Sequence, residues 1–188
     1  MQTDPDAFFS VPHTFRIYAR PWTESALPDD AALAELRSMG MQLLNEAKAL
    51  EATSLMQLRQ LGSDTKALVD YLKLQSRKVD MVLHYVLAND PHEGEPLAGL
   101  RFGGSGVTLR SPTAMADGSR HLLTLYIREE LIALLCVAEV RHCVHEDDGF
   151  RVTLEFVAIS DADTEQLVRA SLSVQQKQLK LRKQQQEG

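Results

Sequence analysis

The period of the hydrophobic pattern changes at Pro91, and this change constrains the fold more than any other feature of the chain. Residues 29–90 are rich in helix-forming residues and show helical spacing of their apolar side chains. After Pro91, apolar and polar residues alternate with the period of two that is typical of strands. We therefore expect an α+β protein in which a long helical segment precedes an antiparallel sheet.

The second half of the helical segment carries a regular heptad pattern, which we call the seam. Its members are separated by steps of four and three residues, and they are Leu61, Thr65, Leu68, Leu72, Gln75, Val79, Val82 and Val86. A seam this narrow and regular favours pairing between helices of different copies. Packing of a helix pair within one chain would show apolar stripes of the same spacing, so it is the competing interpretation. The polar Gln75 is typical of residues that fix helix register at a cost in stability.

Proline, glycine and capping residues predict where the helices begin and end. Pro28 and the acids at 29–30 predict a helix start, because negative charge stabilises the positive end of the helix dipole. Gly40 is a weak helix former, but we expect the helix to continue through it. Residues 62–64 predict a break and the start of a new helix. Pro91 ends the segment.

Alternating residues predict several strands and one final helix. The candidate strands are residues 14–18, which Pro21 ends, and Gly106–Ser111, His121–Arg128, Leu131–His145 and Phe150–Ile159. Residues 146–149 predict a hairpin turn between the last two strands. Ser160 and Asp163 have capping-box spacing and predict the start of a C-terminal helix.

The cysteines and nearby histidines predict neither a disulfide nor a metal site. Cys136 and Cys143 lie an odd number of residues apart in one expected strand, which would place them on opposite faces and too far apart to bridge. His142 and His145 are separated in the same way. We therefore expect free thiols, a reducing cytoplasmic compartment, no metal and no cofactor.

Charge and missing motifs exclude several classes of function. The net charge of −6 argues against nucleic acid as a partner, because such binding neutralises many phosphates. No apolar run has the length of a membrane span, about 18 residues, so we expect no membrane partner. A P-loop, a nucleophile elbow and an HExxH motif are all absent from the sequence, and we assign no catalytic residue.

The strand region resembles the PilZ domain family. The matching segments are Gly106–Leu109, Asp117-Gly118 with His121–Ile127, Ile132–Val140 and Phe150–Val157. The resemblance implies an antiparallel β-barrel of about six strands, of a kind that in many members binds cyclic di-GMP. The heptad helix further resembles an atypical tetrameric PilZ subgroup. The expected organisation is an irregular segment or first strand at 1–28, a helical oligomerisation segment at 29–90 and a barrel with a C-terminal helix at 91–188.

The nucleotide-binding signature of that family is degenerate here. Its first half is R-x-x-x-R, and Arg16 and Arg20 have this spacing but lie before the helical segment. Its second half is [D/N]-x-S-x-x-G. With the last glycine on Gly106, Arg101 stands where the acid or amide belongs and Gly103 where the serine belongs. Each lost hydrogen bond to a polar ligand costs about 1–3 kcal/mol, so binding would weaken roughly a hundredfold or more.

The sequence therefore predicts a non-enzymatic adaptor that self-associates and acts through an unidentified protein partner. The resemblance implies that it is a tetramer. The resemblance implies a role in cyclic di-GMP signalling, motility, type IV pili or virulence, although we do not expect cyclic di-GMP itself to bind. The alternative is a receptor for cyclic di-GMP or a related nucleotide that uses Arg16 and Arg20, with Arg101 and Gly106, in an altered geometry.

Overall fold

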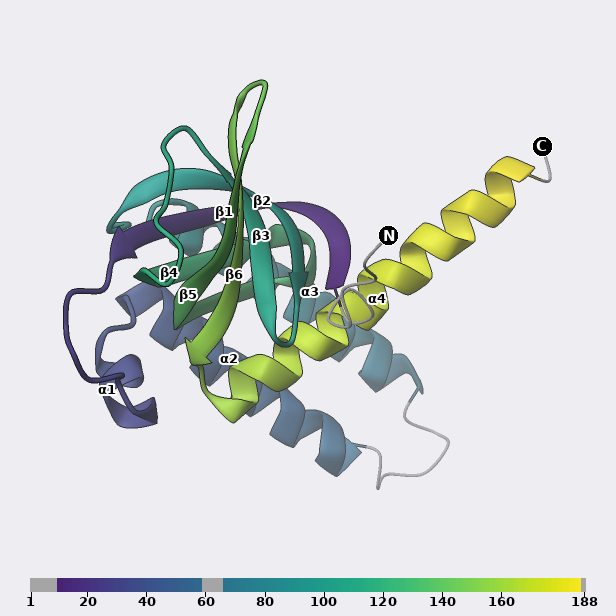
Figure 1. Cartoon of the computed structure of the whole chain (residues 1–188). Helices are drawn as coiled ribbons and strands as arrows, with labels where there is room; N and C mark the ends of the chain where they lie inside the picture. The colour runs from purple at the N-terminus through teal and green to yellow at the C-terminus, as the bar shows by residue number, and fades with distance from the viewer. Residues whose placement is uncertain (1–9, 59–65, 187–188) are drawn as a thin grey trace. The chain divides into compact units, whose positions relative to one another are not determined.

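The chain forms two compact units in a computed structural model that describes residues 10–58 and 66–186 (Figure 1). The first unit, the barrel unit, contains the residues up to Leu36 and those from His92 onward. The second unit, the helical unit, is Arg37–Pro91. The helical unit is therefore an insertion between the first and second strands of the barrel.

Six antiparallel strands close into a barrel, which confirms the expectation from the family resemblance. They are β1 (Ser10–Pro21), β2 (Glu95–Gly103), β3 (Gly106–Ser111), β4 (Arg120–Ile127), β5 (Ile132–Glu146) and β6 (Gly149–Ala158). Their order around the barrel is β1-β2-β3-β6-β5-β4. A closed barrel leaves no strand edge unpaired. A short 3-10 helix, Arg128–Glu130, joins β4 to β5.

Strand β2 was not among the strands predicted from the sequence. Pro96, Gly99 and Gly103 lie within it and weaken the strand signal. The structure explains Gly99, because the ring of Phe15 on β1 occupies the space in which its side chain would stand. The glycine is thus a packing requirement inside a strand, not a break.

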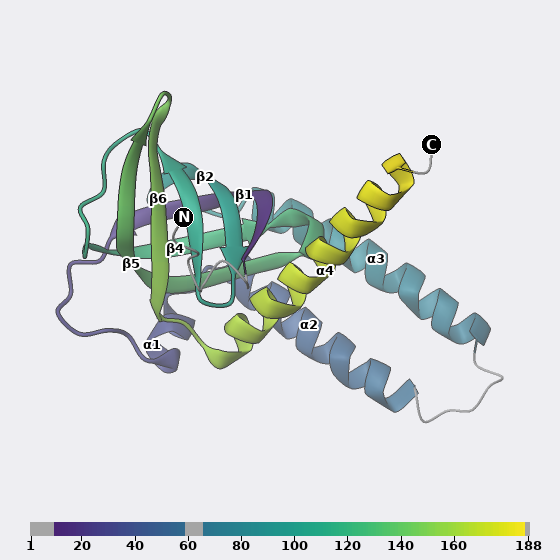
Figure 2. The same ribbon diagram turned by 45° about the vertical axis from the view of Figure 1, so that its right-hand side comes forward.

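The inward residues of all six strands form one core, and helix α4 (Asp161–Gln186) closes one end of it (Figure 2). Ile17, Leu125 and Leu154 are representative inward residues with at most 1% exposure. From α4, Leu167 and Val174 join the same core. The predicted start of this helix is confirmed, since the backbone N–H of Asp163 donates to Ser160 Oγ at 3.2 Å, which is the usual bond of a helix N-cap.

The expected placement of the two cysteines on opposite faces is wrong. Cys136 is buried in the core, and Cys143 is partly buried against the same core. A register shift between Val140 and His142 adds one residue to β5 and reverses the inward and outward alternation beyond it. Both thiols are free, as expected.

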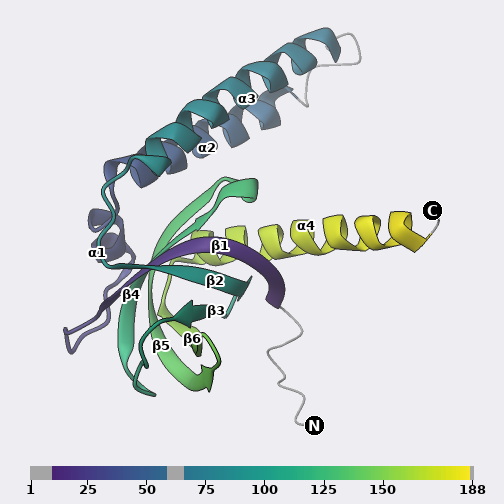
Figure 3. The ribbon, with the colours of Figure 1, turned by 90° about the horizontal axis from the view of Figure 1, so that it is seen from above.

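Helices α2 (Met39–Leu58) and α3 (Lys66–Ala88) lie side by side in the helical unit (Figure 3). Ser38, just before α2, donates its hydroxyl hydrogen to Asp90, just after α3, so the two helices run antiparallel. Leu61, Thr65 and the break expected at 62–64 lie outside the described residues.

The first helix is shorter than its composition predicts. Helix α1 (Asp30–Glu35) begins with Asp29 accepting a hydrogen bond from the N–H of Ala32 at 2.8 Å, as the acidic start predicts. It then stops, and α2 begins at Met39 after a break that was not predicted. Ser38 caps α2 by accepting from the N–H of Met41 at 3.3 Å, because a serine oxygen can satisfy a free N–H of the first turn. No helix in the described part of the chain is long and apolar enough to cross a membrane.

Candidate functional site

The turn between β2 and β3 packs tightly against the rest of the barrel unit. A Cβ atom on Gly106 would stand 2.2 Å from the carbonyl oxygen of Leu154, so β6 leaves no room for a side chain there. A Cβ on Gly104 would stand 2.6 Å from Cγ2 of Val168 on α4. The glycines thus serve close approach of the turn to β6 and to α4.

The guanidinium of Arg101 forms hydrogen bonds within the barrel. Its Nη2 donates to the carbonyl oxygen of Ser10 at 2.9 Å, and its Nε donates to Ser10 Oγ at 3.3 Å. These bonds tie the end of β2 to the start of β1, where Arg101 pairs with Pro12 in the strand register. A phosphate ligand for Arg101 would have to replace them.

Arg16 and Arg20 lie on the outer face of β1, and the structure does not bring them close to Arg101. At about 3.3 Å per residue, the four-residue step between the two arginines spans about 13 Å of strand. Arg16 pairs with Ala98, which lies three residues, about 10 Å, from Arg101 along β2. Arg20 forms an ion pair with Glu93 at 3.2 Å. The guanidinium of Arg16 is exposed and has no hydrogen bond or ion pair with any residue that the structure describes.

Helix α3 exposes much of the predicted seam. Leu68 is 47% exposed and Val82 is 61% exposed, and Val79 is exposed to a similar degree. Leu72, Gln75 and Val86 are half-buried. A single chain therefore leaves the described part of the seam incompletely covered.

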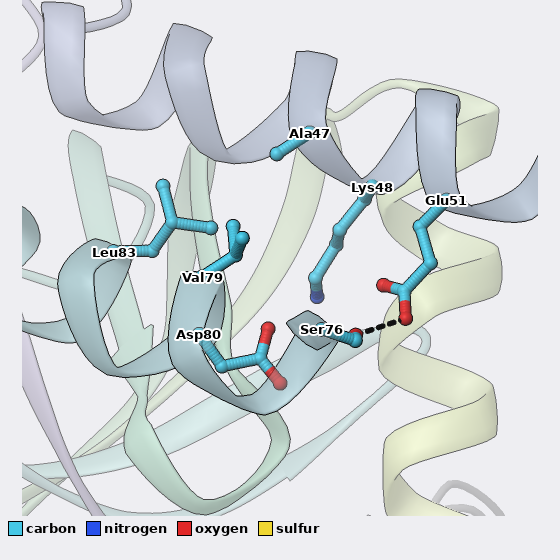
Figure 4. A pocket seen from close by; sticks show the side chains of 7 residues that line it. All are labelled: Ala47, Lys48, Glu51, Ser76, Val79, Asp80 and Leu83. Carbon is cyan, nitrogen blue, oxygen red and sulfur yellow. Dashed lines mark hydrogen bonds between the residues drawn. The ribbon is translucent and has the colours of Figure 1, made fainter. Parts of the chain in front are cut away.

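The contact between α2 and α3 is formed on a face of α3 that adjoins the seam and shares Val79 with it, and the contact is partly polar (Figure 4). A small pocket between the helices is lined by Ala47, Lys48, Glu51, Ser76, Val79, Asp80 and Leu83. Ser76 donates a hydrogen bond to Glu51 across the hairpin. Burial raises the pKa of Asp80, and the negative charge of Glu51 raises it further.

Further exposed apolar residues on α3 were not predicted from the sequence. They are Tyr71, Leu74, Met81 and Tyr85. With Lys78 between Leu74 and Met81, they repeat with steps of three and four residues, as the seam does, displaced by one position. The signal that would have found them is a second heptad pattern on the same helix.

The structural similarity extends over both units. No family model matches the sequence, and no curated protein matches it. A solved structure of a pathogenic protein from Xanthomonas campestris, described as a tetrameric PilZ domain self-assembled via an unusual helical bundle, is 16% identical. The match covers 91% of this chain and 90% of that one, with a TM-score of 0.53. The chain has a PilZ-like fold.

Two other solved structures match in part. The Bacillus subtilis inhibitor of motility MotI/DgrA is 18% identical with a TM-score of 0.42, and the match covers 46% of this chain and 44% of that one. The chain thus matches less than half of the Bacillus protein. The PilZ domain of YcgR from Escherichia coli, solved with c-di-GMP, is 13% identical with a TM-score of 0.39, covering 47% of this chain and 77% of that one. The assignment of a PilZ-like barrel with inserted helices therefore depends on the match to the Xanthomonas structure.

Among the residues that the structure describes, no group of three or more His, Cys, Asp or Glu residues is arranged to hold a metal ion. Cys136 is fully buried, and burial raises the pKa of its thiol. A buried thiol of this kind is inert as a nucleophile, because the thiolate is the reactive form.

Proposed function

We propose that the protein is a non-enzymatic PilZ-like signalling adaptor that self-associates through the seam of α3 and acts through contacts with other proteins. The observation that carries the proposal is the exposed apolar seam on α3, in a chain whose barrel completes its own core. Apolar helix faces of this regularity are stable in water when they pack on another helix. The description of the Xanthomonas protein as a self-assembled tetramer supports a tetramer here.

Light scattering coupled to size exclusion tests the assembly. We expect about four times the chain mass of 21.0 kDa at tens of micromolar. Replacing Leu68 and Val82 with aspartate should reduce the mass, because each substitution places a charge in the apolar interface. Arg77→Asp is the matched control, since Arg77 is exposed on α3 away from the seam. A wild-type monomer, or a seam variant of unchanged mass, would contradict self-association through the seam.

The adaptor does not require cyclic di-GMP as a ligand. The side chains expected at the β2–β3 turn are replaced by Arg101, which bonds Ser10, and by a glycine. Arg16 pairs with Ala98, three residues from Arg101 along β2, and Arg20 lies four residues farther along β1. Titration calorimetry should show no saturable binding of cyclic di-GMP at about 10 μM or tighter.

The competing function is a nucleotide receptor, and Arg16 favours it, because its exposed guanidinium has no partner among the described residues. Saturable binding that Arg16→Ala abolishes would establish the receptor in place of the adaptor. Arg77→Ala provides the control, since Arg77 is an exposed arginine of the helical unit and lies outside the barrel.

A further inference from the structure

Helix α3 carries a second stripe that its own α2 cannot cover. We call it the outer stripe, and its members are Tyr71, Leu74, Lys78, Met81 and Tyr85. Met81 and Tyr85 are each 72% exposed. At about 100° per residue, the outer stripe lies on the side of α3 opposite Ser76 and Leu83, which face α2. The seam lies between these two sides.

Helix α2 carries a matching stripe. Its members, the α2 stripe, are Met39, Leu43, Glu46 and Leu50, with steps of four, three and four residues. All of them are exposed. The α2 stripe is turned roughly a quarter of a turn, about 100°, from the face of α2 that packs on α3. Each stripe contains one charged member, and the charges are opposite.

We propose that the α2 stripe of each copy packs on the outer stripe of the next copy when the copies associate. This inference rests on the proposed self-association through the seam. If the seam of each α3 faces the axis of a parallel bundle, α2 lies on one side of α3 and the outer stripe on the other. Rotation about that axis brings α2 of one copy beside the outer stripe of its neighbour. Side chains wind around every α-helix in the right-handed sense, so the direction of α2 decides to which side its stripe points. Because α2 runs antiparallel to α3, the α2 stripe points toward the outer stripe of this neighbour.

The level of α2 against α3 decides which residues meet. The hydrogen bond from Ser76 to Glu51 sets these two residues at the same height in the hairpin (Figure 4). Rotation about an axis parallel to the helices preserves height. Leu43 of one copy therefore stands opposite Tyr85 of the next, and both are large, exposed and apolar in the single chain.

The charges agree with the same register. Glu46 then lies within about 5 Å of Lys78 of the neighbouring copy along the helix axis, which is less than one helical turn. Their long side chains can span this distance and pair. A second copy of the chain thus supplies matching spacing and an opposite charge, and a closed ring covers every stripe without another protein.

Charge reversal tests the pairing in solution. We expect Glu46→Lys and Lys78→Glu each to weaken association about tenfold or more by analytical ultracentrifugation, because each places like charges opposite one another. The double variant should recover to within about threefold of wild type. Lys73→Glu is the control, because Lys73 is exposed on α3 outside the seam and the outer stripe.

The outcomes separate this inference from the proposed function. If both reversals match Lys73→Glu while the Leu68 and Val82 variant dissociates, the stripe pairing is wrong and the seam stands. If the wild-type chain is a monomer, self-association is wrong and the stripe pairing with it.

Disulfide trapping tests contact between copies directly. Tagged chain with Leu43→Cys is mixed with untagged chain carrying Tyr85→Cys, both with Cys143→Ser to remove the partly exposed native thiol. We expect a mixed disulfide that contains one chain of each kind. Tyr71→Cys in place of Tyr85→Cys should not form it, because Tyr71 stands about 20 Å lower along the helix. Equal trapping with both, or with neither, would overturn the pairing.

Discussion

The barrel unit and the helical unit differ in how completely they bury their apolar side chains. In the barrel, the inward residues of six strands and α4 form one closed core, and Ile17, Leu125 and Phe102 have no exposed surface. In the helical unit, α2 and α3 bury one face against each other and leave other apolar faces exposed, with Tyr85 and Met81 at 72%. The barrel can therefore fold with its own residues alone, whereas the hairpin gains stability from a further partner.

The largest expected effect sharpens this comparison with one substitution in each unit. Phe102→Ala should destabilise the protein by about 3–5 kcal/mol, because core phenylalanine truncations leave a cavity. Its ring is fully buried and contacts Phe15 edge-on at a centroid distance of 5.7 Å. Tyr85→Ala should change the unfolding free energy of the dissociated chain by less than about 0.5 kcal/mol, because the ring is exposed there. Urea unfolding followed by circular dichroism measures both, and equal costs would break the comparison.

The next effect concerns the glycine turn of the barrel. Gly106→Ala should cost about 2–3 kcal/mol, because the new methyl group would meet a backbone oxygen that cannot move away alone. That oxygen belongs to Leu154. Gly104→Ala should cost less, since there the neighbour is a methyl group of Val168 on α4. Thermal unfolding of the two variants checks the order, and a larger loss for Gly104→Ala would mean that α4, and not β6, limits the turn.

The pH dependence of the barrel provides a smaller effect. Burial lowers the pKa of His121 below its ordinary 6.5, so the unfolded chain binds the proton more tightly than the folded one. The contribution of His121 to stability is therefore full above pH 6.5 and falls as the pH decreases from there. His121→Gln should flatten this part of the pH profile in urea unfolding. A profile between about pH 5 and 7 that His121→Gln leaves unchanged would contradict the assignment.

Much of the fold could be predicted from the sequence because it depends on local patterns. The alternating pattern predicts a strand with the same first and last residues as β3, and the Ser160 cap predicts the start of α4. Strand β2 could not be predicted, since Gly99 is explained only by the ring of Phe15 from another strand. The bulge in β5 could not be predicted either. It arises from pairing with β6 and moves Cys143 to the inner face.

The candidate site was predictable to a different degree in each unit. The seam is a periodic pattern within one helix, so it can be read from the sequence. In the structure Val82 is exposed, and a seam that packs on another copy must be exposed in the single chain. The outer stripe has the same heptad spacing as the seam. It can be recognised as a separate face of α3 only when the position of α2 is known. The distance between Arg16 and Arg101 depends on strand register, which no spacing along the chain gives.

The smallest expected effect lies in the helical unit and has the opposite sign to that of His121. Burial first, and then the charge of Glu51, raise the pKa of Asp80 above its ordinary 3.8, so the folded hairpin binds the proton more tightly than the unfolded chain. Stability contributed by this group therefore falls as the pH rises from about 4 through the raised pKa. Asp80→Asn should stabilise the hairpin at pH 7 by less than about 1 kcal/mol, because solvent screens the largely accessible carboxylate. Hydrogen exchange of α3 amides measures it, and faster exchange in the variant would show that the carboxylate stabilises the hairpin through Lys48 or His84 instead.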